Sequence, residues 1–171
     1  DTNSFETNSE INYVQGDYGY DKFSFLIDYI DKNKNLQLHG FKRSYFGNYN
    51  QYYANTLQPQ QQSYTLAINS DKVNQSTALT IGHFNTYSGL PDSITNGLFD
   101  NRITLLNYFY ETILRNISIR ISTDQFLQRF KTNHSLSLYN SSRYLNRSLY
   151  EVEFSYLKLR IPVAVGFKRN N

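Results

Sequence analysis

Strict alternation of apolar residues with polar or small residues near the C-terminal end constrains this chain most. The apolar members are Leu157, Leu159, Ile161, Val163, Val165 and Phe167. Because successive strand residues point to opposite faces, the pattern predicts a β-strand with one apolar face. Its eleven residues match the roughly 9–11 that a tilted strand needs to cross a bilayer. Pro162 cannot donate a ladder hydrogen bond, so it indicates an edge strand, a bulge or the end of regular pairing.

The same two-residue period recurs along the chain and predicts an all-β protein. Residues at the predicted strand positions are rich in aromatic and β-branched types. The predicted strands span residues 23–30, 36–45, 64–69, 79–84, 117–122 and 135–138. Residues 103–114 are apolar on both faces and also fit a helical stripe. A strand is favoured there, because the neighbours are strands and no capping box precedes the segment.

The connections between the predicted strands alternate in length. Asp31–Asn35 and Ser70–Ser76 are short polar turns, whereas Phe46–Gln62 and Tyr87–Asn101 are long loops. In an up-and-down antiparallel sheet this alternation places short turns at one end and long loops at the other. Transmembrane β-barrels have this arrangement.

Length and charge indicate one β domain over residues 1–171, in which 1–21 form a loosely ordered acidic segment. Residues 1–31 carry seven acidic side chains and one basic, and residues 102–171 carry eleven basic and four acidic. These bases are spread singly along the predicted strands, so no nucleic-acid partner is expected. The polar start, Asp1–Glu10, does not resemble a signal peptide. This is expected of a mature product or of a segment of a longer chain.

The chain lacks the residues that several kinds of chemistry need. The chain has no cysteine, which excludes disulfides, zinc–thiolate sites and a thiol nucleophile. No run of about 18 apolar residues could form a transmembrane helix. No nucleophile elbow or glycine-rich phosphate loop is present.

Two partial metal motifs carry little weight. Asp31, Asn33 and Asn35 open like a calcium loop, but Leu36 replaces the required glycine and Lys42 the twelfth-position acid. A hairpin turn is the favoured interpretation. The histidines, His39, His83 and His134, lie on three separate segments; His39 and His83 would meet only if both faced a common lumen. We expect no metal and no cofactor.

Glu151 and Glu153 are the one candidate pair of catalytic carboxylates. They lie at i and i+2, on one face of a strand. Salt bridges to Lys158 or Arg160 on an adjoining strand are the favoured interpretation, and a β-rich hydrolase is a minor alternative. We therefore expect no enzymatic activity.

Aromatic residues near the first long loop, with one from the second, are the candidate ligand-binding residues. They are Tyr45, Tyr49, Asn50, Tyr52, Tyr53 and Tyr87. Flat rings beside amide donors suit the binding of a glycan or another small ligand. The favoured alternative is an aromatic girdle at a membrane surface.

Residues 36–100 resemble barrel strands of bacterial outer-membrane proteins, in particular TonB-dependent receptors. The stretches that carry the resemblance are LQLHGFKRSYFG, NYNQYYANTLQPQQQ, ALTIGHFNTYSGLPD and NGLFDNR; the final FSYLKLRIPVAVGFK is similar to a strand of smaller barrels. The resemblance implies a closed antiparallel barrel of about eight strands, or part of a larger one, in a bacterial outer membrane. Its partner would be the lipid bilayer, or detergent, and its role transport, surface binding or structure.

A soluble fold is the alternative from another class. A β-sandwich or jelly roll would direct the same apolar faces into an internal core. Such a protein would be secreted or displayed at the cell surface, as a carbohydrate-binding, adhesin or capsid-like module.

Overall fold

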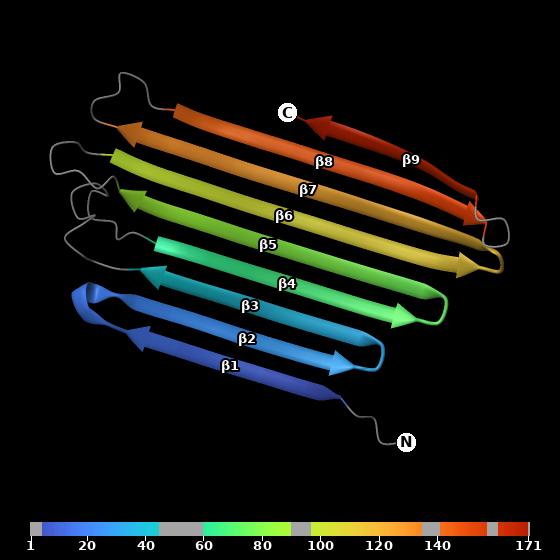
Figure 1. Ribbon diagram of the computed structural model, residues 1–171, viewed down its shortest axis with the longest axis horizontal. Helices are drawn as coiled ribbons and strands as arrows, with labels where there is room; N and C mark the ends of the chain where they lie inside the picture. Colours follow the sequence, from blue (N-terminus) through green and yellow to red (C-terminus); the bar gives the residue numbers. More distant parts are fainter. Residues whose placement is uncertain (1–4, 45–59, 90–96, 135–140, 157–160, 171) are drawn as a thin grey trace.

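The computed structural model describes residues 5–44, 60–89, 97–134, 141–156 and 161–170, which form one antiparallel sheet (Figure 1). Each strand pairs with the next in the chain, in the order β1 to β9. The strands are β1 Glu6–Gln15, β2 Asp21–Asp31, β3 Lys34–Ser44, β4 Gln60–Lys72, β5 Gln75–Gly89, β6 Gly97–Leu114, β7 Ile117–His134, β8 Ser141–Tyr156 and β9 Ile161–Asn170. A single 3₁₀ turn, Asp17–Gly19, joins β1 to β2.

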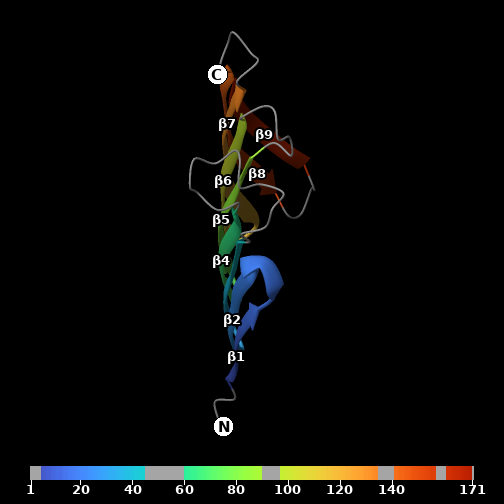
Figure 2. The ribbon, with the colours of Figure 1, turned by 90° about the vertical axis from the view of Figure 1, so that its left-hand side faces the viewer.

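The described residues form one layer. Figure 2 shows the sheet nearly edge-on, with β8 and β9 turning away from the plane of the central strands. Within the described ranges no large side chain is fully buried, so no core lies between two layers. A sandwich or jelly roll needs two packed sheets, and that alternative is wrong for this part of the chain.

The predicted all-β, up-and-down antiparallel architecture is confirmed. The described residues form nine strands, where a barrel of about eight was expected. Strands β1 and β9 are the two edges of the described sheet, so it is open and not a closed barrel. The proline of the C-terminal segment lies near the start of the edge strand β9, one of the three positions that the sequence indicated.

Short turns and long connections lie at opposite ends of the sheet, as predicted (Figure 1). Residues 32–33, 73–74 and 115–116 are two-residue turns, and β8 ends and β9 begins at the same end of the sheet. Arg115 has a φ of 58°, as expected in a two-residue hairpin, where left-handed backbone matches the twist of the strands. The predicted hairpin at Asp31–Asn35 is confirmed.

The long connections contain fewer residues than predicted, because the strands extend into both predicted loops. Gln60–Gln62 belong to β4, Tyr87–Gly89 to β5 and Gly97–Asn101 to β6. Their backbones continue the ladders although their side chains show no apolar alternation, because ladder bonds use only main-chain groups. The remaining connections, 45–59 and 90–96, lie outside the described residues.

Other strand predictions had mixed outcomes. Residues 103–114, ambiguous in sequence, are strand, within β6. Strand β1 was not predicted, because Asn, Ser and Glu dominate it; pairing with β2 along its whole length defines it. It lies inside segment 1–21, from which a loose structure was expected. The predicted strands at 135–138 and, in part, at 157–167 fall on residues outside the description.

Gly40 is the point of closest packing on one face. It pairs with Phe25 on β2 and with Tyr64 on β4, and the two rings stack with centroids 6.4 Å apart. A Cβ at Gly40 would stand 2.5 Å from Phe25 Cζ and 2.7 Å from Tyr64 Cδ1. The glycine therefore leaves the space in which the two rings meet.

We predict that Gly40→Ala lowers the free energy of unfolding by about 1–3 kcal/mol, because the added methyl group must displace both rings. Urea unfolding followed by circular dichroism in detergent measures the change. Gly166→Ala on β9 is the matched control: its nearest neighbour would be 3.5 Å away, and alanine costs less backbone entropy than glycine. Equal effects of the two substitutions would contradict the packing account.

Candidate functional site

The register of the ladders divides the side chains between two faces. Residues directly opposite on neighbouring strands share a face. The row that contains Ile27 continues through Leu38, Leu66, Ile81 and Leu106. We call the face that carries this row the apolar face and the other the polar face.

Most of the exposed large hydrophobic side chains lie on the apolar face. They are Ile11, Tyr13, Phe23, Ile27, Ile68, Ile81, Leu114, Ile117, Ile121, Leu127, Tyr144, Tyr150, Phe154, Tyr156, Val165 and Phe167. Exposure on this scale exceeds what soluble monomers present as one contiguous patch. The apolar face therefore requires a covering that the described residues do not supply.

The apolar band runs diagonally across the strands. Tyr29 and Tyr150 belong to one row, which passes through Leu36, Ile68, Leu79, Tyr108 and Thr123. Tyr29 is the turn-side end of the apolar stretch Phe23–Tyr29, whereas Tyr150 is the loop-side end of the stretch Tyr150–Tyr156. From β2 to β8 the band thus moves by about one residue per strand. With about 3.3 Å per residue and 4.8 Å between strands, the band lies about 35° from the perpendicular to the strands.

Charged side chains limit the band on both sides. On β2 Asp21 and Asp31 are the first and last of eleven residues, about 33 Å apart along the strand, which a tilt of about 35° reduces to a height of about 27 Å. On the loop side the first charges on this face are Lys42, Arg102, Arg129 and Arg169. The band is therefore about as high as the apolar belt of a transmembrane β-barrel, roughly 25 Å, and its strands have the corresponding tilt, roughly 35–45°.

The polar face carries a charged network near the short-turn end. Arg120 Nη2 lies 3.3 Å from Glu111 Oε2, and its Nη1 lies 3.5 Å from Glu153 Oε2. The guanidinium also stands 5.3 Å from the centre of the Phe109 ring, in cation–π range. Ser118 donates a 2.7 Å hydrogen bond to Glu111. Glu153 thus pairs with Arg120; the predicted partners, at 158 and 160, lie outside the described residues.

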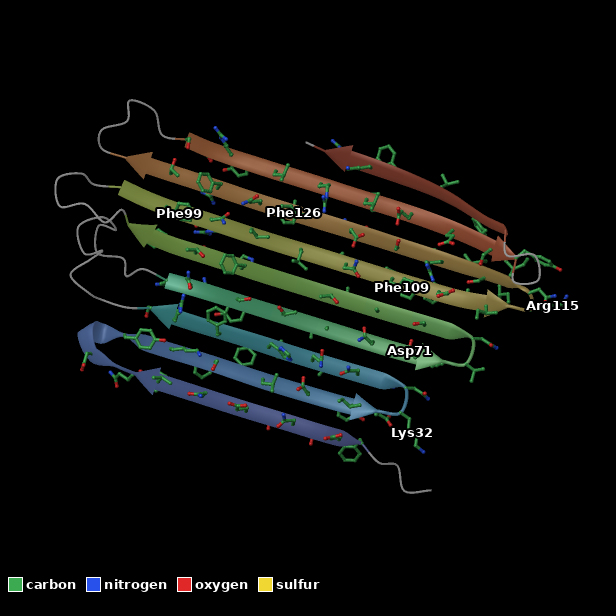
Figure 3. All side chains as sticks on the ribbon, viewed as in Figure 1. Lys32, Asp71, Phe99, Phe109, Arg115 and Phe126 are labelled. Atoms are coloured by element: carbon green, nitrogen blue, oxygen red, sulfur yellow. The ribbon has the colours of Figure 1, made fainter. Side chains whose placement is uncertain are left out.

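A hollow of 520 Å³ lies beside this network. Asn107, Asp124 and Glu151 line it with Phe109, Arg120 and others, and the Asn107 amide donates to Asp124. The Glu151 carboxylate accepts a weak 3.4 Å hydrogen bond from Ser122. Figure 3 labels Phe109, Phe126 and Phe99, which lie in that order from the short-turn end toward the loop end. The hollow is wide and polar, as expected of a water-facing surface.

The two described histidines do not form a common site. His39 lies on the polar face, 3.2 Å from Asp28 Oδ1, whereas His83 lies on the apolar face, where its Nδ1 is 2.9 Å from Thr104 Oγ1. The third, His134, ends β7. Across the described ranges no three His, Cys, Asp or Glu side chains gather as a metal site would require.

The predicted ligand-binding residues are mostly outside the description. Tyr45, Tyr49, Asn50, Tyr52 and Tyr53 lie in 45–59. Tyr87, expected in a loop, is instead paired within the sheet, between Gln60 and Asp100.

Tyr87 lies six residues beyond Ile81 on β5, outside the apolar band. Burial raises the pKa of its phenol, and the negative charge of Asp100 raises it further. The phenol is therefore held protonated, as a hydrogen-bond donor at the loop end of the sheet.

Comparison of the chain with protein-family models, with curated proteins and with solved structures finds no match. In the described part of the chain, no helix is long and apolar enough to cross a membrane. The geometry of the two faces is thus the basis for any functional assignment.

We predict that Arg120→Gln lowers the free energy of unfolding by up to about 1 kcal/mol, because Glu111 and Glu153 lose their shared cation. The magnitude is small because the arginine side chain is 46% exposed and solvent screens the pairs. Urea unfolding at low salt measures it. In a Glu111→Gln/Glu153→Gln background the loss should shrink to the part due to the Phe109 contact, and an undiminished loss would contradict the network.

Proposed function

We propose that this chain forms part of the wall of an outer-membrane β-barrel, with its apolar face toward lipid. The tilted band carries the proposal. Its height and slope are the two dimensions that a bilayer imposes on a barrel wall. The height comes from the charges at the two ends of β2, and the slope comes from the register of the apolar stretches. The antiparallel sheet and its short and long connections, at opposite ends, support the same assignment.

Aromatic side chains add support at the loop-side boundary of the band. Tyr13, Phe23, Tyr64 and Phe167 lie there on the apolar face. Rings that combine an apolar body with a polar edge favour the level of the lipid headgroups. We propose that these strand residues form an aromatic girdle; the girdle expected from the sequence was placed on the first long loop instead.

Closure of the barrel requires strands beyond β1 and β9. Both edges run from the short-turn end toward the loop end, because nine strands separate them by an even number of reversals. Pairing β9 directly with β1 would therefore be parallel. An all-antiparallel barrel needs an odd number of further strands between them, so we propose that the sheet is a segment of a larger barrel.

The polar face would then line a water-filled interior. The Arg120 network and the hollow beside it are suited to water and unsuited to hydrocarbon. We propose a non-enzymatic role in transport, surface binding or structure. The resemblance of residues 36–100 to TonB-dependent receptors is consistent with this role and adds no separate support.

Two substitutions on one strand and one face test the lipid assignment. Ile121 and Leu127 on β7 are similarly exposed, at 42% and 46%. Ile121 lies in the middle of the band, whereas Leu127 lies at its loop-side limit. We predict that Ile121→Lys destabilises the chain in phosphatidylcholine vesicles by about 2–4 kcal/mol and Leu127→Lys by about 0–1 kcal/mol.

The measurement is urea unfolding of the vesicle-inserted chain, with flotation of the vesicles to confirm insertion. Ser122→Lys, next to Ile121 but on the polar face, is the control and should insert normally. Equal losses at residues 121 and 127 would remove the basis for the tilted band. A chain that is monodisperse in buffer, without detergent or vesicles, would reject the proposed function altogether.

A further inference from the structure

Two arginines stand directly opposite each other on the apolar face. Arg102 on β6 is the register partner of Arg129 on β7. Both are exposed at the loop end. Like charges in directly opposed positions destabilise a sheet. This pair therefore destabilises the fold unless an anion binds between the two guanidinium groups.

The surrounding charges neutralise the pair only in part. Arg102 Nε lies 3.1 Å from Asp100 Oδ1, but Asp100 is itself directly opposite Lys131. The described ion pairs give Arg129 no carboxylate. Three bases therefore share one acid, and the group retains a net positive charge.

Hydrogen-bond donors extend the row on both sides. Asn85 on β5 is opposite Arg102, and Tyr144 on β8 is opposite Arg129. Tyr144 is 69% exposed, and its phenol can donate. The row thus carries an amide, two guanidinium groups and a phenol on four successive strands of one face.

The depth of the row identifies the source of the anion. Arg129 lies two residues past Leu127, the last apolar residue of β7 on this face. This spacing is about 5 Å along the bilayer normal. Lipid phosphates lie just outside the hydrocarbon, where arginine side chains reach them by extending along the surface. Lys42, which lies in the same row on β3, and Arg169 on β9 add positive charge on the loop side of this face.

We propose that Arg102 and Arg129, with Lys131 and Tyr144, bind the phosphate group of an anionic membrane lipid. Two planar guanidinium groups suit the tetrahedral oxygens of a phosphate. This inference rests on the proposed function, since it requires the apolar face to meet lipid. Free inorganic phosphate offers the same chemistry without an acyl anchor, so it forms a separate arm of the test.

The test compares urea unfolding of the chain in phosphatidylcholine vesicles with and without phosphatidylglycerol. An anionic lipid that binds the folded state should lower the unfolding equilibrium constant. In Arg102→Gln/Arg129→Gln we expect this lipid-dependent effect to fall by about 30-fold. Each base near the surface contributes about 1 kcal/mol, and about 1.4 kcal/mol corresponds to a factor of ten. Insertion into pure phosphatidylcholine should be unchanged.

Lys22→Gln/Arg43→Gln is the matched control. These two bases are also directly opposite each other near the loop end, but on the polar face. The control should keep the full phosphatidylglycerol effect. Inorganic phosphate added to phosphatidylcholine vesicles should not reproduce it.

The remaining outcomes overturn the proposal in distinguishable ways. An unchanged lipid effect in Arg102→Gln/Arg129→Gln rejects the site while leaving the barrel proposal intact. An equal loss in the polar-face control shows attraction by total charge, and stabilisation by inorganic phosphate alone shows an anion site that does not select lipid. Failure of the parent chain to insert into either kind of vesicle rejects the proposed function, and this inference with it.

Discussion

Backbone hydrogen bonding between neighbouring strands is the interaction on which every other feature of this sheet depends. The described residues supply no second layer, so packing across a core cannot define the register. Eight successive ladders do so instead, and they extend over strands of 10 to 18 residues. Because side chains alternate along each strand, the ladders decide together which residues share a face. A slip of one residue in any ladder would send the apolar side chains of every strand beyond that ladder to the polar face.

Much of the fold could be predicted from the sequence, because alternation is a local signal. The isoleucines of 117–121 and the leucines of 36–38 identify their strands without reference to any partner. Strand β1 could not be identified in this way, since its Asn, Ser and Glu residues carry little strand preference and its structure comes from pairing with β2. The polar ends of β4 and β5 were assigned to loops for the same reason. Main-chain pairing continues where side-chain pattern stops.

The candidate site could not be predicted from the sequence, because it combines residues from several strands. Arg102 and Arg129 are unremarkable positions in sequence, 27 residues apart, and only the β6–β7 register makes them neighbours. The Arg120 network likewise joins three strands. The slope of the apolar band needs all the ladders between β2 and β8. Conversely, the loop tyrosines that composition singled out lie beyond the described residues, and Tyr87, the exception, is a strand residue whose partner is Asp100.

Because the number of strands is odd, the start of β1 and the end of β9 lie at opposite ends of the sheet. Strand β1 starts where the short turns lie, and β9 finishes where the long connections lie (Figure 1). In a bilayer these are different aqueous compartments. In the proposed barrel, the chain would enter β1 from one side of the membrane and leave β9 on the other. The odd number of further strands that the proposed barrel needs would return the chain to the side from which it entered β1.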